Sequence, residues 1–335
     1  MQNLIETLER SFPGKRIVIV GDLVADQFLH GTIARVSREA PVFILKHEET
    51  DTCAGGAANA AVNVASLGGE PILIGVTGQD AEGELLAGKL KNSGVNCDFV
   101  IADKDLRTTT KVRVLAGQHY APKQQVIRID YENQAEISPE VTERLVSNLR
   151  SATDTADAII ISDYNYGAAG REIFELARSI SKQKRIPLLI DSRFRLADFP
   201  GATSATPNQE EVEQILGKDF TPESCEELRS QLGFESLLVT CGNKGMMLVE
   251  TGKPPIHIEA VGSTEPVDVT GAGDTVIAVY ALGLASRLSF NQAAVVANHA
   301  GGIVVMKKGT ASVCTAELVE SIKNHAKAGA LESAS

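Results

Sequence analysis

Short apolar runs alternate with longer segments of helical length along most of the chain. Residues 16–20 read Arg-Ile-Val-Ile-Val, and similar runs lie at 72–75, 158–162, 187–191 and 236–240. Continuous runs of this kind are typical of strands buried on both faces of a parallel sheet. The segments expected to be helical lie at 82–93, 139–149, 168–182, 290–305 and 315–326. This rhythm predicts an α/β fold with a parallel sheet covered on both faces.

Two pairs of β-rich segments stand apart from the alternation, because no helical segment adjoins them. They lie at about 28–48 and about 108–130. Strands of this kind fit a small sheet that stands off the main one, and we expect it to form a lid. The sequence shows no repeat and no convincing linker, so we expect one domain over residues 1–328 and a frayed tail at 329–335.

Composition and charge narrow the class of protein. The 335 residues are 43% hydrophobic and carry a net charge of −11, which disfavours a nucleic-acid-binding surface. No apolar run is long enough for a membrane span and the first residues do not resemble a signal peptide, so we expect a cytoplasmic protein without a membrane partner. The five cysteines are scattered without a C-x-x-C pair, which indicates free thiols.

The segment 266–275 carries the strongest chemical signal. Its glycines, Gly271 and Gly273, flank Ala272 and precede an apolar run of helical length. Such a turn exposes backbone N–H groups at the positive end of a helix, where an anion binds readily. Asp274 lies just inside this predicted helix. Its carboxylate is either a first-turn capping group or a general base that takes a proton from a hydroxyl, and the segment alone leaves both open.

Two other glycine-rich motifs are excluded by spacing. A dinucleotide fingerprint would need a third small residue where Val276 stands, and it would follow the first strand of a βαβ unit. A phosphate-binding loop of the Walker type would need Gly-Lys-Ser or Gly-Lys-Thr, which the sequence lacks.

Polar residues follow several of the predicted strands. Asp22 and Asp26 come after the first strand, and Asp163, Asp191 and Thr240 end three others. In open α/β sheets ligands bind at the carboxyl ends of the strands, so these groups are candidates for one site. As solvated loop acids, Asp22 and Asp26 would need no function.

Three further segments could take part in binding. Gly55 and Gly56 precede a small-residue helix that holds Asn59, and they serve either ligand approach or packing. Asn208 and Glu211 open another helix, as a cap or as magnesium ligands. The turn after the strand at 236–240 contains Thr240, Gly242 and Gly245, which suit a nucleotide phosphate or an ordinary hairpin.

The segments 55–59 and 268–274 together resemble the two signatures of the ribokinase-like (PfkB) sugar kinases, in the same order and with a similar separation. Asn208-x-x-Glu211 resembles a further motif of that family, and Thr240-x-Gly242-x-x-Gly245 resembles its nucleotide-binding turn. The resemblance covers roughly residues 15 to 320. It implies a ribokinase-like three-layer α/β/α sandwich with a small β-sheet lid.

The resemblance also implies a role for each candidate residue. Asp274 would be the catalytic base, with an anion pocket formed by the amides of Gly271, Ala272 and Gly273. The sugar would contact Asp22, Asp26, Gly55, Gly56 and Asn59, and ATP would contact Asn208, Thr240, Gly242, Gly245 and Asn298. Mg²⁺ and its waters would be organised by Asn208 and Glu211. A K⁺ requirement is common in the family, and paired lid sheets favour a homodimer.

Within the family, the residues are most similar to those of bacterial kinases of D-glycero-β-D-manno-heptose 7-phosphate, which implies phosphorylation at O1. Lys111, Arg113 and Arg128 on the predicted lid would bind the substrate phosphate, or would be solvated charges only. Tyr166 stands where those kinases often carry a lysine, which removes a charged contact. The His-x-Gly-His motif of the nucleotidyltransferase often fused to them does not occur in this chain.

Two other functions remain open at this point. The chain could phosphorylate another acceptor, such as fructose phosphate, ribose or a nucleoside. It could also be a binding protein that kept the fold and lost turnover, although the intact glycines and Asp274 argue against this.

Overall fold

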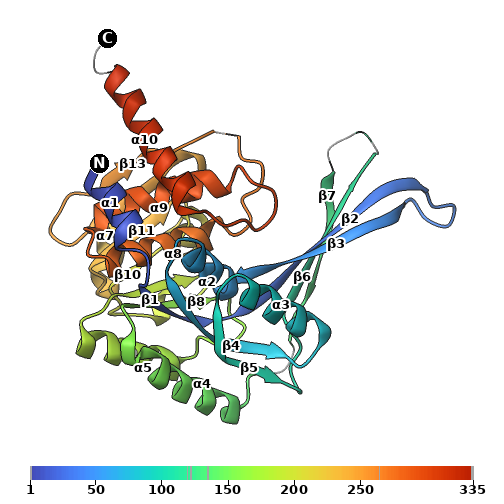
Figure 1. Ribbon diagram of the computed structural model, residues 1–335, viewed down its shortest axis with the longest axis horizontal. Helices are drawn as coiled ribbons and strands as arrows, with labels where there is room; N and C mark the ends of the chain where they lie inside the picture. The colour runs from blue at the N-terminus through green and yellow to red at the C-terminus, as the bar shows by residue number, and fades with distance from the viewer. Residues whose placement is uncertain (1, 119, 121–122, 134–135, 264, 333–335) are drawn as a thin grey trace.

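A nine-stranded sheet forms the centre of the computed structural model, which describes residues 2–332 apart from 119, 121–122, 134–135 and 264 (Figure 1). The strand order is β13-β12-β11-β10-β9-β8-β1-β4-β5, and all pairs are parallel except β11–β12 and β12–β13. The strands are β1 (Arg16–Gly21), β4 (Glu70–Gly78), β5 (Asn96–Asp103), β8 (Ala158–Asp163), β9 (Leu188–Ser192), β10 (Ser204–Ala205), β11 (Ser236–Thr240), β12 (Met246–Glu250) and β13 (Ile256–Ile258). The mainly parallel sheet is therefore confirmed.

Helices cover both faces of this sheet. They are α1 (Gln2–Arg10), α2 (Ala57–Ser66), α3 (Ala81–Asn92), α4 (Pro139–Ala152), α5 (Arg171–Lys184), α6 (Gln209–Leu216), α7 (Pro222–Leu232), α8 (Ala272–Ala285), α9 (Phe290–Val304) and α10 (Thr315–Glu332). One face packs against α2, α8 and α9, and the other against α4 and α5 (Figure 1). The fold is a three-layer sandwich, as expected.

The burial of strand β1 explains why its sequence is a continuous apolar run and does not alternate between apolar and polar residues. Ile17 and Ile19 belong to the hydrophobic core on one face of the sheet, whereas Val18 and Val20 belong to the core on the other. All four side chains are fully buried. Because side chains alternate between the faces of a strand, a sheet covered twice needs apolar residues at every position.

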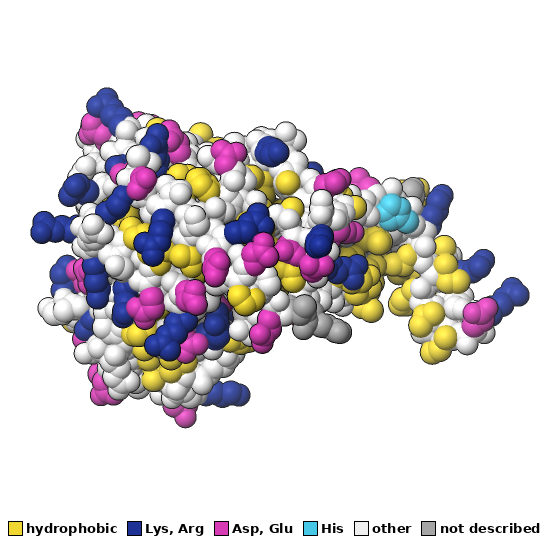
Figure 2. All heavy atoms as spheres, turned by 90° about the horizontal axis from the view of Figure 1, so that it is seen from below, with side chains coloured by type: hydrophobic (Ala, Val, Ile, Leu, Met, Phe, Trp, Pro, Cys, Tyr) yellow, Lys and Arg dark blue, Asp and Glu magenta, His cyan; other side chains and the backbone are white. Residues whose placement is uncertain are grey.

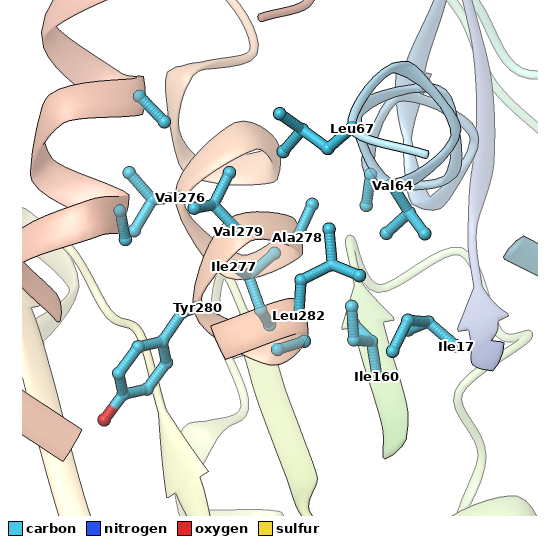
Figure 3. Packing of buried hydrophobic residues seen from close by; sticks show 14 of the residues in the cluster. Ile17, Val64, Leu67, Ile160, Val276, Ile277, Ala278, Val279, Tyr280 and Leu282 are labelled. Atoms are coloured by element: carbon cyan, nitrogen blue, oxygen red, sulfur yellow. The ribbon is translucent and has the colours of Figure 1, made fainter. Parts of the chain in front are cut away.

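Helix α8 lies at the centre of the larger core. Every residue from Asp274 to Ala285 is buried, and Figure 3 shows Val279 and Leu282 near Val64 of α2 and Ile17 of β1. A helix that is apolar all round belongs in a protein interior. Its N-terminus is thereby held at one place in the fold, and Asp274 is its third residue.

The lid is a four-stranded sheet in the order β3-β2-β6-β7 that projects from the body (Figure 1). Its strands are β2 (Leu23–Val36), β3 (Phe43–Gly56), β6 (Thr110–Gly117) and β7 (Gln124–Tyr131). The expected strands are present, but β2 and β3 extend further toward the body. Gly55 and Gly56 end β3, which runs directly into α2, and so they do not form the separate loop that a glycine pair would favour.

Several elements were not predicted. Helix α1 was not predicted because its sequence is polar. Leu8 in this helix is nevertheless fully buried, as is Phe12 just after it. Strands β5, β10 and β13 and helix α7 were also missed; β10 has only two residues. Helix α10 continues to Glu332, and residues 333–335 of the expected tail lie outside the described residues.

Two smaller expectations concern cysteines and membranes. All five cysteines are free. Within the described part of the chain, no helix combines the length and the apolar character that crossing a bilayer requires.

Candidate active site

Asp274 meets Asn59 in the folded chain, although 215 positions separate them in sequence. Asn59 Nδ2 donates to Oδ2 of Asp274 at 2.9 Å, and the Tyr164 hydroxyl donates to Oδ1 at 2.8 Å. The Asp274 carboxylate is buried, and both of these donors are neutral. The two glycine-rich segments of the sequence are thus brought together around one acid.

Burial raises the pKa of Asp274 to about 6, while the hydrogen bonds from Asn59 and Tyr164 oppose the rise. The negative charge of Asp26 raises this pKa and the positive charge of Lys111 lowers it. A carboxyl group with a pKa close to neutrality accepts a proton more readily than an ordinary aspartate and is still ionised at pH 7. These are the properties of a general base.

The turn before α8 exposes backbone donors beside this acid. Gly271 has a left-handed backbone with φ of 77°, and a Cβ there would lie 2.5 Å from Asn59 Nδ2. Within the described residues, the N–H groups of Gly271 and Gly273 have no acceptor, whereas that of Ala272 donates to the Val269 carbonyl at 3.3 Å. The turn therefore has two free amides among the described residues, and the anion pocket formed by the three amides of Gly271, Ala272 and Gly273 stays a prediction.

Two cavities meet at the start of α8. The first, of about 180 Å³, has mainly apolar walls and includes Gly242, Gly245 and Asn298. The second, of about 250 Å³, is polar and includes Asp191, Arg193 and Glu211. Thr240 and Gly273 line both. An apolar chamber that opens into a polar one beside free amides suits a nucleotide base and its phosphates, respectively.

The residues predicted to contact the nucleotide lie at the first cavity. Gly242 and Gly245 have positive φ angles of 58° and 89°, and a Cβ on Gly245 would lie 2.0 Å from the Ile258 carbonyl oxygen. This turn also joins antiparallel strands β11 and β12, so the hairpin alternative holds as well. The Asn298 side chain donates to the Glu259 carbonyl at 2.7 Å.

Asn208 and Glu211 form a capping box at the start of α6. Asn208 Oδ1 accepts from the Glu211 N–H, and Glu211 Oε2 accepts from the Asn208 N–H, both at 2.9 Å. The helix-cap alternative is therefore confirmed for Asn208, whose amide oxygen is already engaged. Burial raises the pKa of Glu211 to about 7. A cation held in this cavity would offset that cost of burying a carboxylate.

Asp22 organises the loop that follows β8. Its Oδ2 accepts from the N–H groups of Tyr164 and Tyr166, at 2.8 and 3.0 Å, and its Oδ1 accepts from that of Ala168 at 3.0 Å. The side chain is buried. The expected sugar contact stays a prediction, whereas the contacts show a structural role that the sequence did not reveal.

The predicted phosphate-binding cations differ in their partners. Arg113 makes a buried ion pair with Asp26, and exposed Arg128 pairs with Asp130 through two hydrogen bonds of 2.9 and 3.0 Å. Lys111 is buried, and its ammonium has no ion pair or hydrogen bond with any residue in the described ranges. Lys111 is therefore the member of the trio that is free to bind an anion.

Gly55 is required by the packing beside this ion pair. A Cβ at Gly55 would lie 2.5 Å from Oδ2 of Asp26. The absence of a side chain at Gly55 therefore lets β3 approach the acid on β2. The packing alternative is confirmed for this residue, and a direct sugar contact stays a prediction.

Residues 15–317 match the family model described as pfkB family carbohydrate kinase. The chain belongs to the pfkB family of carbohydrate kinases. The bifunctional protein HldE of Desulfatibacillum aliphaticivorans is 37% identical over 313 residues, which cover 92% of this chain and 63% of that protein. HldE of Alkalilimnicola ehrlichii is 40% identical over 326 residues, covering 95% and 65%. The chain thus spans a little under two thirds of the length of these relatives.

Solved structures share the pfkB fold at lower identity. Ribokinase of Arabidopsis thaliana, complexed with ribose and ATP, is 21% identical with a TM-score of 0.70, covering 93% of this chain and 99% of that one. Phosphofructokinase-2 of Escherichia coli, in complex with potassium, is 18% identical with a TM-score of 0.73, covering 92% and 97%. The expected ribokinase-like fold is confirmed.

Family membership also confirms the expected enzyme class, a phosphotransferase, and implies ATP and a divalent metal ion. The sequence did not point to Tyr164 or Arg193, and it indicated Asp191 as a candidate for the site without a specific role. Asp191 and Arg193 lie at the end of β9 and line the polar cavity. Arg193 directly follows β9, and this position was a usable signal for it. Nothing in the sequence indicated the hydrogen bond from Tyr164 to Asp274.

Substitution of Asp22 by asparagine tests its structural role. An amide nitrogen would face one of three N–H donors, and a buried donor without an acceptor costs about 1–3 kcal/mol. We therefore expect Asp22→Asn to lower the free energy of unfolding in urea by about 2 kcal/mol. Exposed Asp154→Asn is the matched control. Unchanged stability together with a raised KM for the sugar would instead make Asp22 a ligand only.

Proposed function

We propose that this kinase transfers the γ-phosphate of ATP to O1 of D-glycero-β-D-manno-heptose 7-phosphate. The observation that carries the proposal is the position of Asp274, a buried carboxylate that directly follows Gly273, the residue that lines both the apolar cavity and the polar one. The sequence resemblance to heptose phosphate kinases supports the acceptor, and so does the similarity to HldE proteins. As a kinase that uses ATP, it would act in the cytoplasm.

The chemistry follows from the geometry of the acid. Asp274 takes the proton of the acceptor hydroxyl while the hydroxyl oxygen forms a bond to the γ-phosphorus. The bond from that phosphorus to the bridging oxygen breaks, and ADP leaves with the electron pair. The free N–H groups of Gly271 and Gly273, at the positive end of α8, stabilise the charge on the transferred group.

The polar cavity would hold magnesium near the phosphates. Among the described residues, the second carboxylate oxygen of Glu211 has no hydrogen-bond partner. Asp191, half-buried nearby, has a pKa raised well above its ordinary value by burial and by the charge of Glu211. These two carboxylates would hold Mg²⁺ directly or through water, with Asn208 fixing Glu211. A magnesium ion held there would supply positive charge that offsets the charge of the ATP phosphates.

The distal phosphate of the acceptor needs a cation, and Lys111 provides one. Its ammonium is buried without an anionic partner in the described residues, and burial lowers its pKa. Arg193 contributes positive potential nearby, since its charge lowers the pKa of Lys111 further. A phosphate dianion placed between them would be stabilised by both.

The lid provides a surface for a second copy of the chain. Its outer part exposes large apolar side chains, among them Val36, Val42, Phe43, Val126 and Ile127, each with 49–59% of its area accessible. Figure 2 shows hydrophobic side chains gathered on the projecting arm. Exposed apolar side chains gathered on a projecting part of a protein are typical of an interface. We therefore propose a homodimer joined through the lids.

An acceptor screen tests the proposed activity. We expect ADP release to show the highest kcat/KM with heptose 7-phosphate, compared with fructose 1-phosphate, fructose 6-phosphate, ribose and adenosine. Phosphorus NMR of the product should place the new phosphate on C1. Asp274→Asn should lower kcat by about 10²- to 10⁴-fold while the Kd for ATP stays within a few-fold. Wild-type turnover in that variant would refute the base assignment.

Lys111→Met tests recognition of the acceptor phosphate. The loss of one charged hydrogen bond should raise KM for the phosphorylated acceptor by about 10- to 100-fold. Arg128→Met is the control, because Arg128 already pairs with Asp130 and should raise this KM much less. An equal rise in both variants would contradict the choice of Lys111.

Light scattering of the purified protein tests the dimer. The wild type should have twice the 35.6 kDa mass of the chain, and Phe43→Asp with Ile127→Asp should return it to one chain mass. A monomeric wild type at micromolar concentration would rule out a stable lid-to-lid dimer.

A further inference from the structure

Tyr164 contacts the proposed base from the side opposite Asn59. It follows β8 in the loop toward α5, and its hydroxyl donates to Oδ1 of Asp274 at 2.8 Å. We propose that Tyr164 is a positioning residue that, with Asn59 on Oδ2, aims the Asp274 carboxylate at the acceptor hydroxyl. This inference rests on the proposed role of Asp274 as the base.

The two donors come from different layers of the fold, so together they fix the carboxylate plane. Asn59 is itself oriented, because its Oδ1 accepts from Asn63 Nδ2 at 3.2 Å and its Nδ2 is thereby turned toward Asp274. Burial and the charge of Asp274 raise the pKa of Tyr164 well above its ordinary value. The hydroxyl therefore stays protonated and remains a donor. Each carboxylate oxygen keeps a lone pair for the acceptor.

Two residues lie close to the Tyr164 ring. Gly56, with φ of 59°, lies against it, and a Cβ at Gly56 would come within 3.3 Å of the ring. The Lys111 ammonium lies 5.3 Å from the ring centroid, which is within the range of a cation–π contact. The Tyr164 N–H is bound by Asp22. A side chain fixed at backbone and ring can hold its hydroxyl in one place.

Few charged groups act on Asp274. Asp26 on β2 and Asp191 on β9 disfavour its negative charge, and Lys111 on β6 favours it. Asn59 on α2 is neutral, and Asp274 is the one acidic residue in the first turn of α8. Removal of the Tyr164 hydroxyl would leave the ionised carboxylate with one donor fewer. Its pKa would then rise further, which changes the pH dependence of catalysis.

Tyr164→Phe is the direct test, because it removes the hydroxyl and keeps the ring beside Lys111. With the wild-type base titrating near pH 6, we expect the acid limb of the kcat profile to move up by about one pH unit. The kcat should fall about fivefold at pH 6 and less than about twofold at pH 8.5. An acid limb that stays at the wild-type pH would overturn the proposal.

Tyr166→Phe is the matched control. It removes a tyrosine hydroxyl from the same loop, but that hydroxyl donates to Glu132 Oε1 at 2.6 Å. The acid limb should stay where it is in the wild type. A shift equal to that of Tyr164→Phe would show that any disturbance of the loop moves the base, and would overturn a specific role for Tyr164.

A second measurement does not depend on the acceptor. In protein labelled with ¹³C-aspartate, the Asp274 carboxyl resonance can be assigned by its loss in Asp274→Asn and titrated by NMR. The pH at the midpoint of this titration should rise by about one pH unit in Tyr164→Phe and stay unchanged in Tyr166→Phe. An unchanged midpoint in Tyr164→Phe would overturn the positioning role. Absence of turnover with heptose 7-phosphate would refute only the proposed acceptor.

Discussion

The site is built around one constraint: a carboxylate buried at the start of a core helix, which has two neutral hydrogen-bond donors and no ion pair with any described residue. An isolated charge of this kind is costly in a protein interior, and the raised pKa of Asp274 records that cost. Helix α8 offsets part of it, because its positive end faces the acid. The hydrogen bonds from Asn59 and Tyr164 offset the remaining cost of burying the charge, and for this reason both side chains are closely packed.

The surrounding acids extend the same principle. Asp22, Asp191 and Glu211 also have raised pKa values, and burial is the largest cause for each. Asp22 offsets its burial with backbone N–H groups, whereas Asp191 and Glu211 face a cavity where a metal ion would fit. The fold therefore concentrates negative charge at this site. The protein neutralises only part of it, and bound ligands would neutralise the rest.

The lid adds positive charge to the site. Strands β2 and β6 bring Asp26, Lys111 and Arg113 together, and the Asp26–Arg113 pair leaves Lys111 as the open cation. Since β3 continues directly into α2, the lid is connected by a few residues of chain to Asn59, which contacts Asp274. A movement of the lid would therefore change the position of Asn59.

The sequence by itself determined the layers, the lid and the acid at the head of α8, because apolar runs and glycine turns are local signals. The sequence also limited the role of Asn208 to a helix cap or a ligand, and the role of Gly55 to packing or ligand binding. It did not decide between these alternatives. Only the tertiary structure decided these questions, paired Arg113 with Asp26, and placed Tyr164 on Asp274. Such contacts join positions far apart in the chain, and no spacing in one sequence encodes which distant donor completes a buried carboxylate.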